Sequence, residues 1–132
     1  MEILQPAGWP SPSGYSNGIK THGTMIFVAG QVGWDEECVF TSDRLTDQAH
    51  RALKNIVAVL REGSAEPRHI VRMTWYVVDI DEYRAARKEI GRIYREVMGD
   101  HYPVMTLFQV AGLVDEGAKV EIEATAVIPV TD

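Results

Sequence analysis

The 132-residue sequence has a single cysteine and no excess of positive charge, and each absence excludes a class of protein. Cys38 cannot form a disulfide within the chain, and the four histidines lack the spacing of metal ligands. Thirteen Lys and Arg against 19 Asp and Glu give a formal charge of −6, whereas nucleic-acid binding depends on clustered cations. The sequence therefore predicts no metal site, no disulfide scaffold and no nucleic-acid partner.

Long apolar runs are also missing. No stretch approaches the roughly 20 apolar residues that a transmembrane helix needs, and residues 1–12 lack the basic and apolar segments of a secretory signal. We therefore expect a cytoplasmic protein without a membrane partner. The length fits one domain, residues 1–132, and the 45% hydrophobic and 24% charged content is typical of an ordered globular fold.

Proline and glycine mark the first part of the chain. Three prolines and two glycines lie within residues 1–14, which disfavours regular structure and predicts an extended N-terminal arm. Two short strand-like segments follow, 15–20 and 24–29. Because Gly23 can supply the positive φ of a tight turn between them, we predict a β-hairpin.

Two amphipathic helices are predicted by apolar residues at helical spacing, one with its apolar stripe from Leu45 to Leu60 and one with its stripe from Tyr83 to Val97. Each is bounded by residue types that are typical of helix ends. The candidate caps are Ser42 or Asp43 and Gly63 for the first helix, and Asp79 or Asp81 and Gly99 for the second.

Three further strands are predicted over residues 70–79, 103–110 and 118–130. The resulting order, ββαβαββ, predicts an α+β domain with one mixed sheet and both helices on one of its faces. Since the strand 70–79 carries apolar residues on both of its faces, we expect a partner to cover the second face, by self-association into a ring or dimer.

The order of several short motifs along this frame resembles the RidA/YjgF family, over nearly the whole chain. The resemblance implies a chorismate-mutase-like fold, a homotrimer whose sheets enclose a barrel, and clefts between neighbouring subunits. It also implies hydrolysis of small-molecule imines or enamines to a keto acid and ammonia, without metal or cofactor. The motifs are Gly14-Tyr15-Ser16, Val28-Ala29-Gly30-Gln31, Gln48-Ala49, residues 74–79 and Val120-Glu121-Ile122-Glu123-Ala124.

One position departs from the family pattern. In the family's deaminases, an arginine two residues after the strand-opening proline binds the substrate carboxylate, but here Pro103 is followed by Met105. A thioether cannot pair with a carboxylate, so the usual 2-imino acid substrate is not implied for this chain. Arg87, on the second helix, is a candidate replacement; the alternative is a solvated surface charge.

The resemblance implies roles for other residues too. Glu121 matches the glutamate that positions or activates the hydrolytic water, although Glu121 and Glu123 could equally share a solvated face. Tyr15 matches a tyrosine at the mouth of the cleft, where a packing role is the alternative. Gly30 and Gln31 match a loop whose N–H groups approach the ligand, and an ordinary turn is the alternative.

Apolar residues near these positions predict a pocket for a larger or aromatic substrate, with core packing or subunit contacts as the alternative. They are Trp34, Met105, Leu107 and Phe108, and Thr106 beside Met105 completes the candidate binding set.

Two functions fit these observations. The first is a divergent deaminase, a hydrolase of imines or enamines in which Glu121 is catalytic. The second is a trimeric small-molecule binding or regulatory protein that has lost catalysis together with the arginine. Ribonuclease activity, a name attached to some relatives of the family, is disfavoured by the acidic composition.

Overall fold

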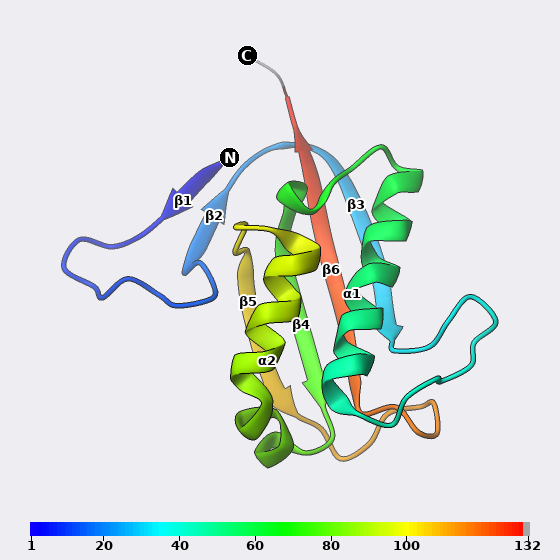
Figure 1. Ribbon diagram of the computed structural model, residues 1–132. Helices are drawn as coiled ribbons and strands as arrows, with labels where there is room; N and C mark the ends of the chain where they lie inside the picture. The colour runs from blue at the N-terminus through cyan, green and yellow to red at the C-terminus, as the bar shows by residue number, and fades with distance from the viewer. Residues whose placement is uncertain (131–132) are drawn as a thin grey trace.

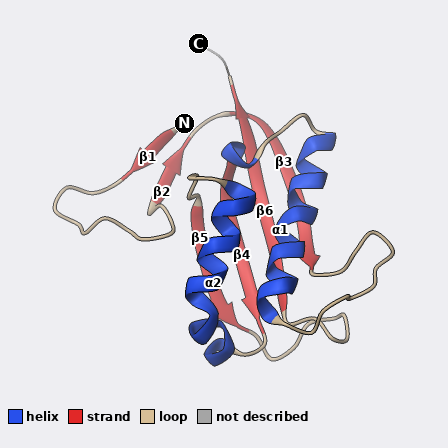
Figure 2. Ribbon diagram, viewed as in Figure 1, coloured by secondary structure: helices blue, strands red, loops and turns tan. Residues whose placement is uncertain are grey.

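The structure, a computed structural model, describes residues 1–130 and has two sheets and two long helices (Figure 1). In the larger sheet the strand order is β3-β6-β4-β5, and only β4 and β5 are parallel. Both helices lie on one face of this sheet (Figure 2), which confirms the predicted α+β fold. The elements are β1 (Glu2–Leu4), β2 (Gly18–Lys20), β3 (Gly23–Val32), α1 (Leu45–Glu62), the 3-10 turn η1 (Pro67–His69), β4 (Ile70–Val77), α2 (Ile80–Met98), β5 (Val104–Gln109) and β6 (Val120–Pro129).

Helix α2 begins and ends where the sequence predicts. The Asp79 carboxylate accepts hydrogen bonds from the backbone N–H groups of Asp81 and Glu82, at 3.0 and 3.1 Å. Gly99 follows the last turn with a φ of 71°, a conformation that favours glycine. Asp79 is therefore the N-cap of the helix that carries Arg87.

Helix α1 begins later than predicted. Its N-cap is Arg44 rather than Ser42 or Asp43, and no side chain caps it. The Ser42 hydroxyl instead accepts a hydrogen bond from the Arg44 N–H at 3.1 Å, and the buried Gln48 amide donates to the Ser42 carbonyl at 3.0 Å. These bonds hold the chain extended through residue 44. The predicted end at Gly63 is confirmed.

The N-terminal segment differs from the prediction in two ways. Residues 1–14 contain strand β1, because the prolines begin only at Pro6, and β1 pairs with β2 in a separate two-stranded sheet. The predicted hairpin is wrong, since β3 pairs with β6 from its first residue. Neither Thr21 nor His22 has the positive φ that a tight two-residue hairpin turn requires.

The two faces of the large sheet have different surroundings. On the helix side, Met73, Trp75 and Val77 of the interior strand β4 are at most 2% exposed. We call the other side the open face. Within residues 1–130 no layer covers it, and it carries Met25, Phe27, Thr74, Tyr76, Thr106, Phe108, Glu121 and Glu123.

Candidate functional site

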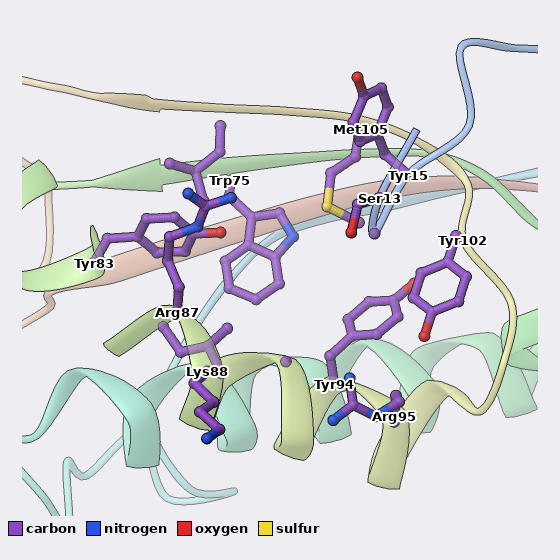
Figure 3. A pocket seen from close by; sticks show the side chains of 14 residues that line it. Ser13, Tyr15, Trp75, Tyr83, Arg87, Lys88, Tyr94, Arg95, Tyr102 and Met105 are labelled. Atoms are coloured by element: carbon purple, nitrogen blue, oxygen red, sulfur yellow. The ribbon is translucent and has the colours of Figure 1, made fainter. Parts of the chain in front are cut away.

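A cavity of about 500 Å³ lies between α2 and the edge strand β5, on the helix side of the sheet (Figure 3). We call it the α2–β5 cavity. Four residues that the sequence analysis proposed for the site, Tyr15, Arg87, Met105 and Leu107, line it together. The other lining residues are Ser13, Gly14, Trp75, Tyr83, Lys88, Ile90, Gly91, Tyr94, Arg95 and Tyr102.

Tyr15 reaches the cavity because the next residue is fastened to the start of β5. The Ser16 N–H donates to the Pro103 carbonyl at 3.0 Å, and the Ser16 hydroxyl donates to the Tyr102 carbonyl at 2.5 Å. Ser16 also forms a parallel bridge with Val104. The Tyr15 side chain, 42% exposed, therefore lies at the rim of the cavity.

One face of α2 forms a wall of the cavity. Tyr83, Arg87 and Tyr94 are four and seven residues apart, so they project from the same side of the helix. The Tyr94 hydroxyl donates to the His101 carbonyl at 2.7 Å, and its ring stacks on Tyr102 at a centroid distance of 5.6 Å. Burial raises the pKa of both Tyr83 and Tyr94, which keeps these phenols neutral at physiological pH.

The charges at the cavity are all positive. Arg87, Lys88 and Arg95 line it, and no Asp or Glu of the described residues 1–130 does so. Within the same range, none of the three cations forms an ion pair, although Arg84 and Arg92 on the same helix do. The cavity is thus a cationic region in a chain whose formal charge is −6.

Glu121 lies elsewhere, on β6 at the open face. A β-bulge between Val28 and Gln31 brings the backbone of Gly30 against it: a Cβ atom on Gly30 would lie 2.0 Å from Oε2 of Glu121. Burial raises the pKa of the Glu121 carboxyl, and the nearby carboxylates of Asp115 and Glu123 raise it further. A carboxyl group in such surroundings is suited to general acid–base chemistry.

Four other predicted residues do not line the cavity, and one of them, Phe108, lies on the open face. The Gln31 amide turns back and donates to the Ala29 carbonyl at 3.1 Å. Trp34 lies in the loop after β3 and packs against Phe40, with ring centroids 5.6 Å apart. Thr106 lies on the open face, because neighbouring residues of a strand point to opposite sides and Met105 faces α2.

The predicted site is therefore divided within one chain. Tyr15, Arg87 and Met105 lie on the helix side, whereas Gly30 and Glu121 meet at the other side of the sheet. The sheet separates the two groups, so a single copy does not bring Glu121 to the cavity.

The sequence analysis missed most of the aromatic lining. None of Trp75, Tyr83 and Tyr94 was a candidate site residue: Trp75 lies within the predicted strand 70–79, and both tyrosines lie within the second predicted helix. The available signal was that Arg87 shares the helical face of these two tyrosines, which makes it the one charged residue on an otherwise aromatic and apolar stripe.

Comparison with known proteins assigns the family. Residues 9–128 match the family model described as Endoribonuclease L-PSP. The chain belongs to the RidA/YjgF family. A RutC family protein of Pyrococcus abyssi is 32% identical over 127 residues, which is 95% of each chain.

Two further RidA/YjgF relatives are informative. The human 2-iminobutanoate/2-iminopropanoate deaminase is 28% identical over 127 residues, covering 95% of this chain and 88% of that protein. The crystal structure of the Rid family protein YyfB from Yersinia pestis matches with a TM-score of 0.81 at 28% identity, covering 96% of this chain and 98% of that one. This structural match confirms the fold that the resemblance implies.

Over residues 1–130, no cluster of three or more His, Cys, Asp or Glu side chains is placed to hold a metal ion. Neither helix described here is long and apolar enough to cross a membrane.

Proposed function

We propose that this RidA/YjgF protein is a cofactor-independent deaminase that hydrolyses an imine or enamine in a cleft between copies of a homotrimer. One observation carries the proposal. The half-buried Glu121 carboxyl packs against the backbone of Gly30, and burial raises the pKa of this carboxyl. The name of the human relative, 2-iminobutanoate/2-iminopropanoate deaminase, supports the class of substrate.

The proposed reaction needs one group that moves protons. An enamine first tautomerises to the imine. Water then adds to the imine carbon as the C=N π bond breaks; Glu121 takes one proton from that water, and the nitrogen takes one proton from solvent. In the resulting carbinolamine Glu121 gives its proton to the nitrogen, the hydroxyl gives its proton to solvent, and the C–N bond breaks, which yields a ketone and releases ammonia. A carboxyl group with a raised pKa can accept the first proton and return it to the leaving nitrogen.

A second copy would complete the site. The open face exposes Met25, Phe27 and Phe108, which are 55%, 71% and 43% exposed in the single chain, and such apolar residues favour burial against another subunit. We place the substrate between the α2–β5 cavity of one copy and Glu121 of its neighbour. This arrangement accounts for the division of the site residues between two faces of the sheet.

Met105 supports a second candidate function, a trimeric small-molecule binding or regulatory protein without turnover. No residue of β5 that lines the cavity is charged, so the position that holds the arginine in the family's deaminases contributes no anion-binding group here. Turnover of an imine separates the two candidates, because a binding protein raises its melting temperature with ligand but forms no product.

The test of the deaminase proposal uses freshly generated 2-aminoacrylate and imines of larger amino acids, with keto-acid release as the measurement. Wild type should accelerate release, and Glu121→Gln should lose about a hundredfold or more of that acceleration. Glu116→Gln, at an exposed loop position outside both groups of site residues, is the control and should keep most of it. Equal rates for wild type and Glu121→Gln would overturn the assigned role. Ligand-dependent stabilisation without any release would favour the binding protein.

A further inference from the structure

We infer that the α2–β5 cavity binds the carboxylate of an aromatic acid, and that Arg87 of α2 is the anchor for this group. The inference rests on the proposed function in one respect: the acid is the part of the imine or enamine substrate that stays unchanged in the reaction. It assigns the anion-binding role to the helix rather than to β5, where Met105 stands.

The charge distribution indicates an anionic ligand. Three cations surround the cavity without an ion-pair partner in residues 1–130, and no carboxylate of that range lines it. Acidic residues outnumber basic ones in the chain, 19 to 13, so a cavity lined by basic residues alone is not a consequence of composition. A bound carboxylate would supply the missing partner.

Arg87 is the best placed of the three cations. In Figure 3 its side chain rises from α2 toward the strand layer that carries Trp75, whereas the Lys88 side chain extends away from that layer. Arg95 lies at the other end of the cavity, next to Tyr94. The planar guanidinium can also hold a carboxylate through two parallel hydrogen bonds, which an ammonium group cannot do.

The lining indicates an aromatic body for the ligand. Four of the five tyrosines of the chain line this one cavity, together with Trp75. Aromatic walls favour planar apolar groups through offset or edge-to-face contacts. A volume of about 500 Å³ falls within the range of pockets for ligands much larger than a three-carbon imino acid.

Trp75 provides an independent observation. It is only 2% exposed, and its indole N–H has no acceptor within residues 1–130. Buried donors without a partner are rare in folded proteins, and each one calls for an explanation. The Trp75 side chain lines the cavity while its N–H is shielded in this conformation, so we assign a ligand oxygen as its acceptor after a shift of the indole ring on binding.

Binding of non-hydrolysable probes tests this inference without any need for turnover. The probes are 3-phenylpropanoate, its neutral amide 3-phenylpropanamide, and propanoate, each titrated into the full-length protein by calorimetry. We expect 3-phenylpropanoate to bind roughly tenfold or more tightly than the amide, because the charged group pairs with Arg87, and more tightly than propanoate, because the ring packs on the tyrosines. Equal affinity for the acid and its amide would overturn the inference.

Two variants locate the anchor. Arg87→Gln should weaken binding of 3-phenylpropanoate roughly tenfold or more and leave the affinity for the amide unchanged. Arg84→Gln is the matched control: it removes a guanidinium from the same helix that already pairs with Asp81 and does not line the cavity, so binding should stay as in wild type. Equal losses in both variants would show a general effect of charge and would contradict the inference.

Trp75→Phe removes the indole N–H and keeps an aromatic ring. We expect weaker binding of the acid, with the melting temperature measured in parallel to confirm that the variant is folded. Unchanged affinity in a folded Trp75→Phe protein would contradict the assigned acceptor.

The inference and the proposed function fail in different ways. Tight, Arg87-dependent binding of the aromatic acid without hydrolysis of any imine would overturn the deaminase proposal alone. Hydrolysis that 3-phenylpropanoate does not inhibit would overturn the inference alone. A short RNA oligonucleotide serves as a third probe, and Arg87-dependent binding of RNA in place of the acid would also overturn the inference.

Discussion

Glu121 and Gly30 are in such close contact that a Cβ atom at position 30 would lie 2.0 Å from the Glu121 carboxylate. Glycine is therefore required at this position for the carboxylate to keep its place. The atoms in the way, Oε2, Cδ and Cγ of Glu121, all belong to its flexible side chain and none to the backbone, so the side chain can move away at little cost. A substitution of Gly30 can therefore change the activity of the protein while leaving its stability almost unchanged.

We predict that Gly30→Ala displaces the Glu121 carboxylate, lowering hydrolysis at least about tenfold while changing stability by no more than about 1 kcal/mol. Keto-acid release and urea unfolding measure the two effects. Gly112→Ala is the control, since a Cβ at Gly112 meets no atom within 4 Å. An active Gly30→Ala protein would show that the position of the carboxylate does not matter.

Glu121 also predicts a pH-dependent stability. Its pKa is raised in the folded state, chiefly by burial, so the folded chain holds this proton more tightly than the unfolded chain does. The contribution of protonated Glu121 to the free energy of unfolding is fully present below the pKa that Glu121 has in the unfolded chain. It is lost as the pH rises through the pKa that Glu121 has in the folded chain. Glu121→Gln should therefore match wild type in acid and become relatively more stable toward neutral pH.

Melting temperatures of wild type and Glu121→Gln, recorded from acid to neutral pH, measure this difference in stability. Glu116→Gln, at an exposed loop position, is the control and should show a difference that does not change with pH. A Glu121→Gln protein that becomes relatively less stable toward neutral pH would contradict the assigned direction of the pKa shift.

The cap of α2 gives a prediction about stability. Asp79→Ala removes the acceptor for two backbone N–H groups and should cost about 1 kcal/mol, measured by urea unfolding. Asp43→Ala, at a cap position that the sequence predicted but the structure does not use, should change stability by less than about 0.5 kcal/mol. Similar losses in the two variants would contradict the assigned cap.

Met105→Arg should restore an anion-binding group on β5. We expect it to improve the use of small 2-imino acids roughly tenfold to a hundredfold in kcat/KM, the range expected for one charge-assisted pair. Met105→Leu keeps the volume without the charge and should not improve it. If the arginine variant gains nothing, the position does not select the substrate in this chain.

The sequence predicted the features that depend on local chemistry. Asp79, Gly63 and Gly99 bound the helices as expected, because capping depends on residues a few positions apart. It could not predict the partner of β3, because β6 lies nearly 90 residues further along the chain and pairing over that distance depends on the whole sheet. The hairpin prediction failed for this reason.

The candidate site was predictable residue by residue, but its geometry was not. Alternation along β5 places Met105 and Thr106 on opposite sides of the sheet. The sequence alone does not show which of the two faces the core, because that depends on which side of the sheet the helices cover. Tyr15 reaches the cavity only because Ser16 is hydrogen-bonded to the start of β5. The side-chain hydrogen bond, from Ser16 to Tyr102, joins residues that are 86 positions apart in the sequence. The resemblance to the RidA/YjgF family identified these positions, whereas the local sequence pattern did not.

Complementation between two inactive variants tests the shared site most directly. Glu121→Gln removes the proposed catalytic group, and Gly91→Trp fills the cavity from α2, where an added Cβ meets only Arg95 at 3.5 Å. Each variant alone should be inactive. In the proposed homotrimer, co-expression gives some clefts that pair an open cavity from one copy with Glu121 from the next, so we predict recovery of about one quarter of the wild-type activity. Verified mixed trimers with no recovered activity would contradict a site shared between copies.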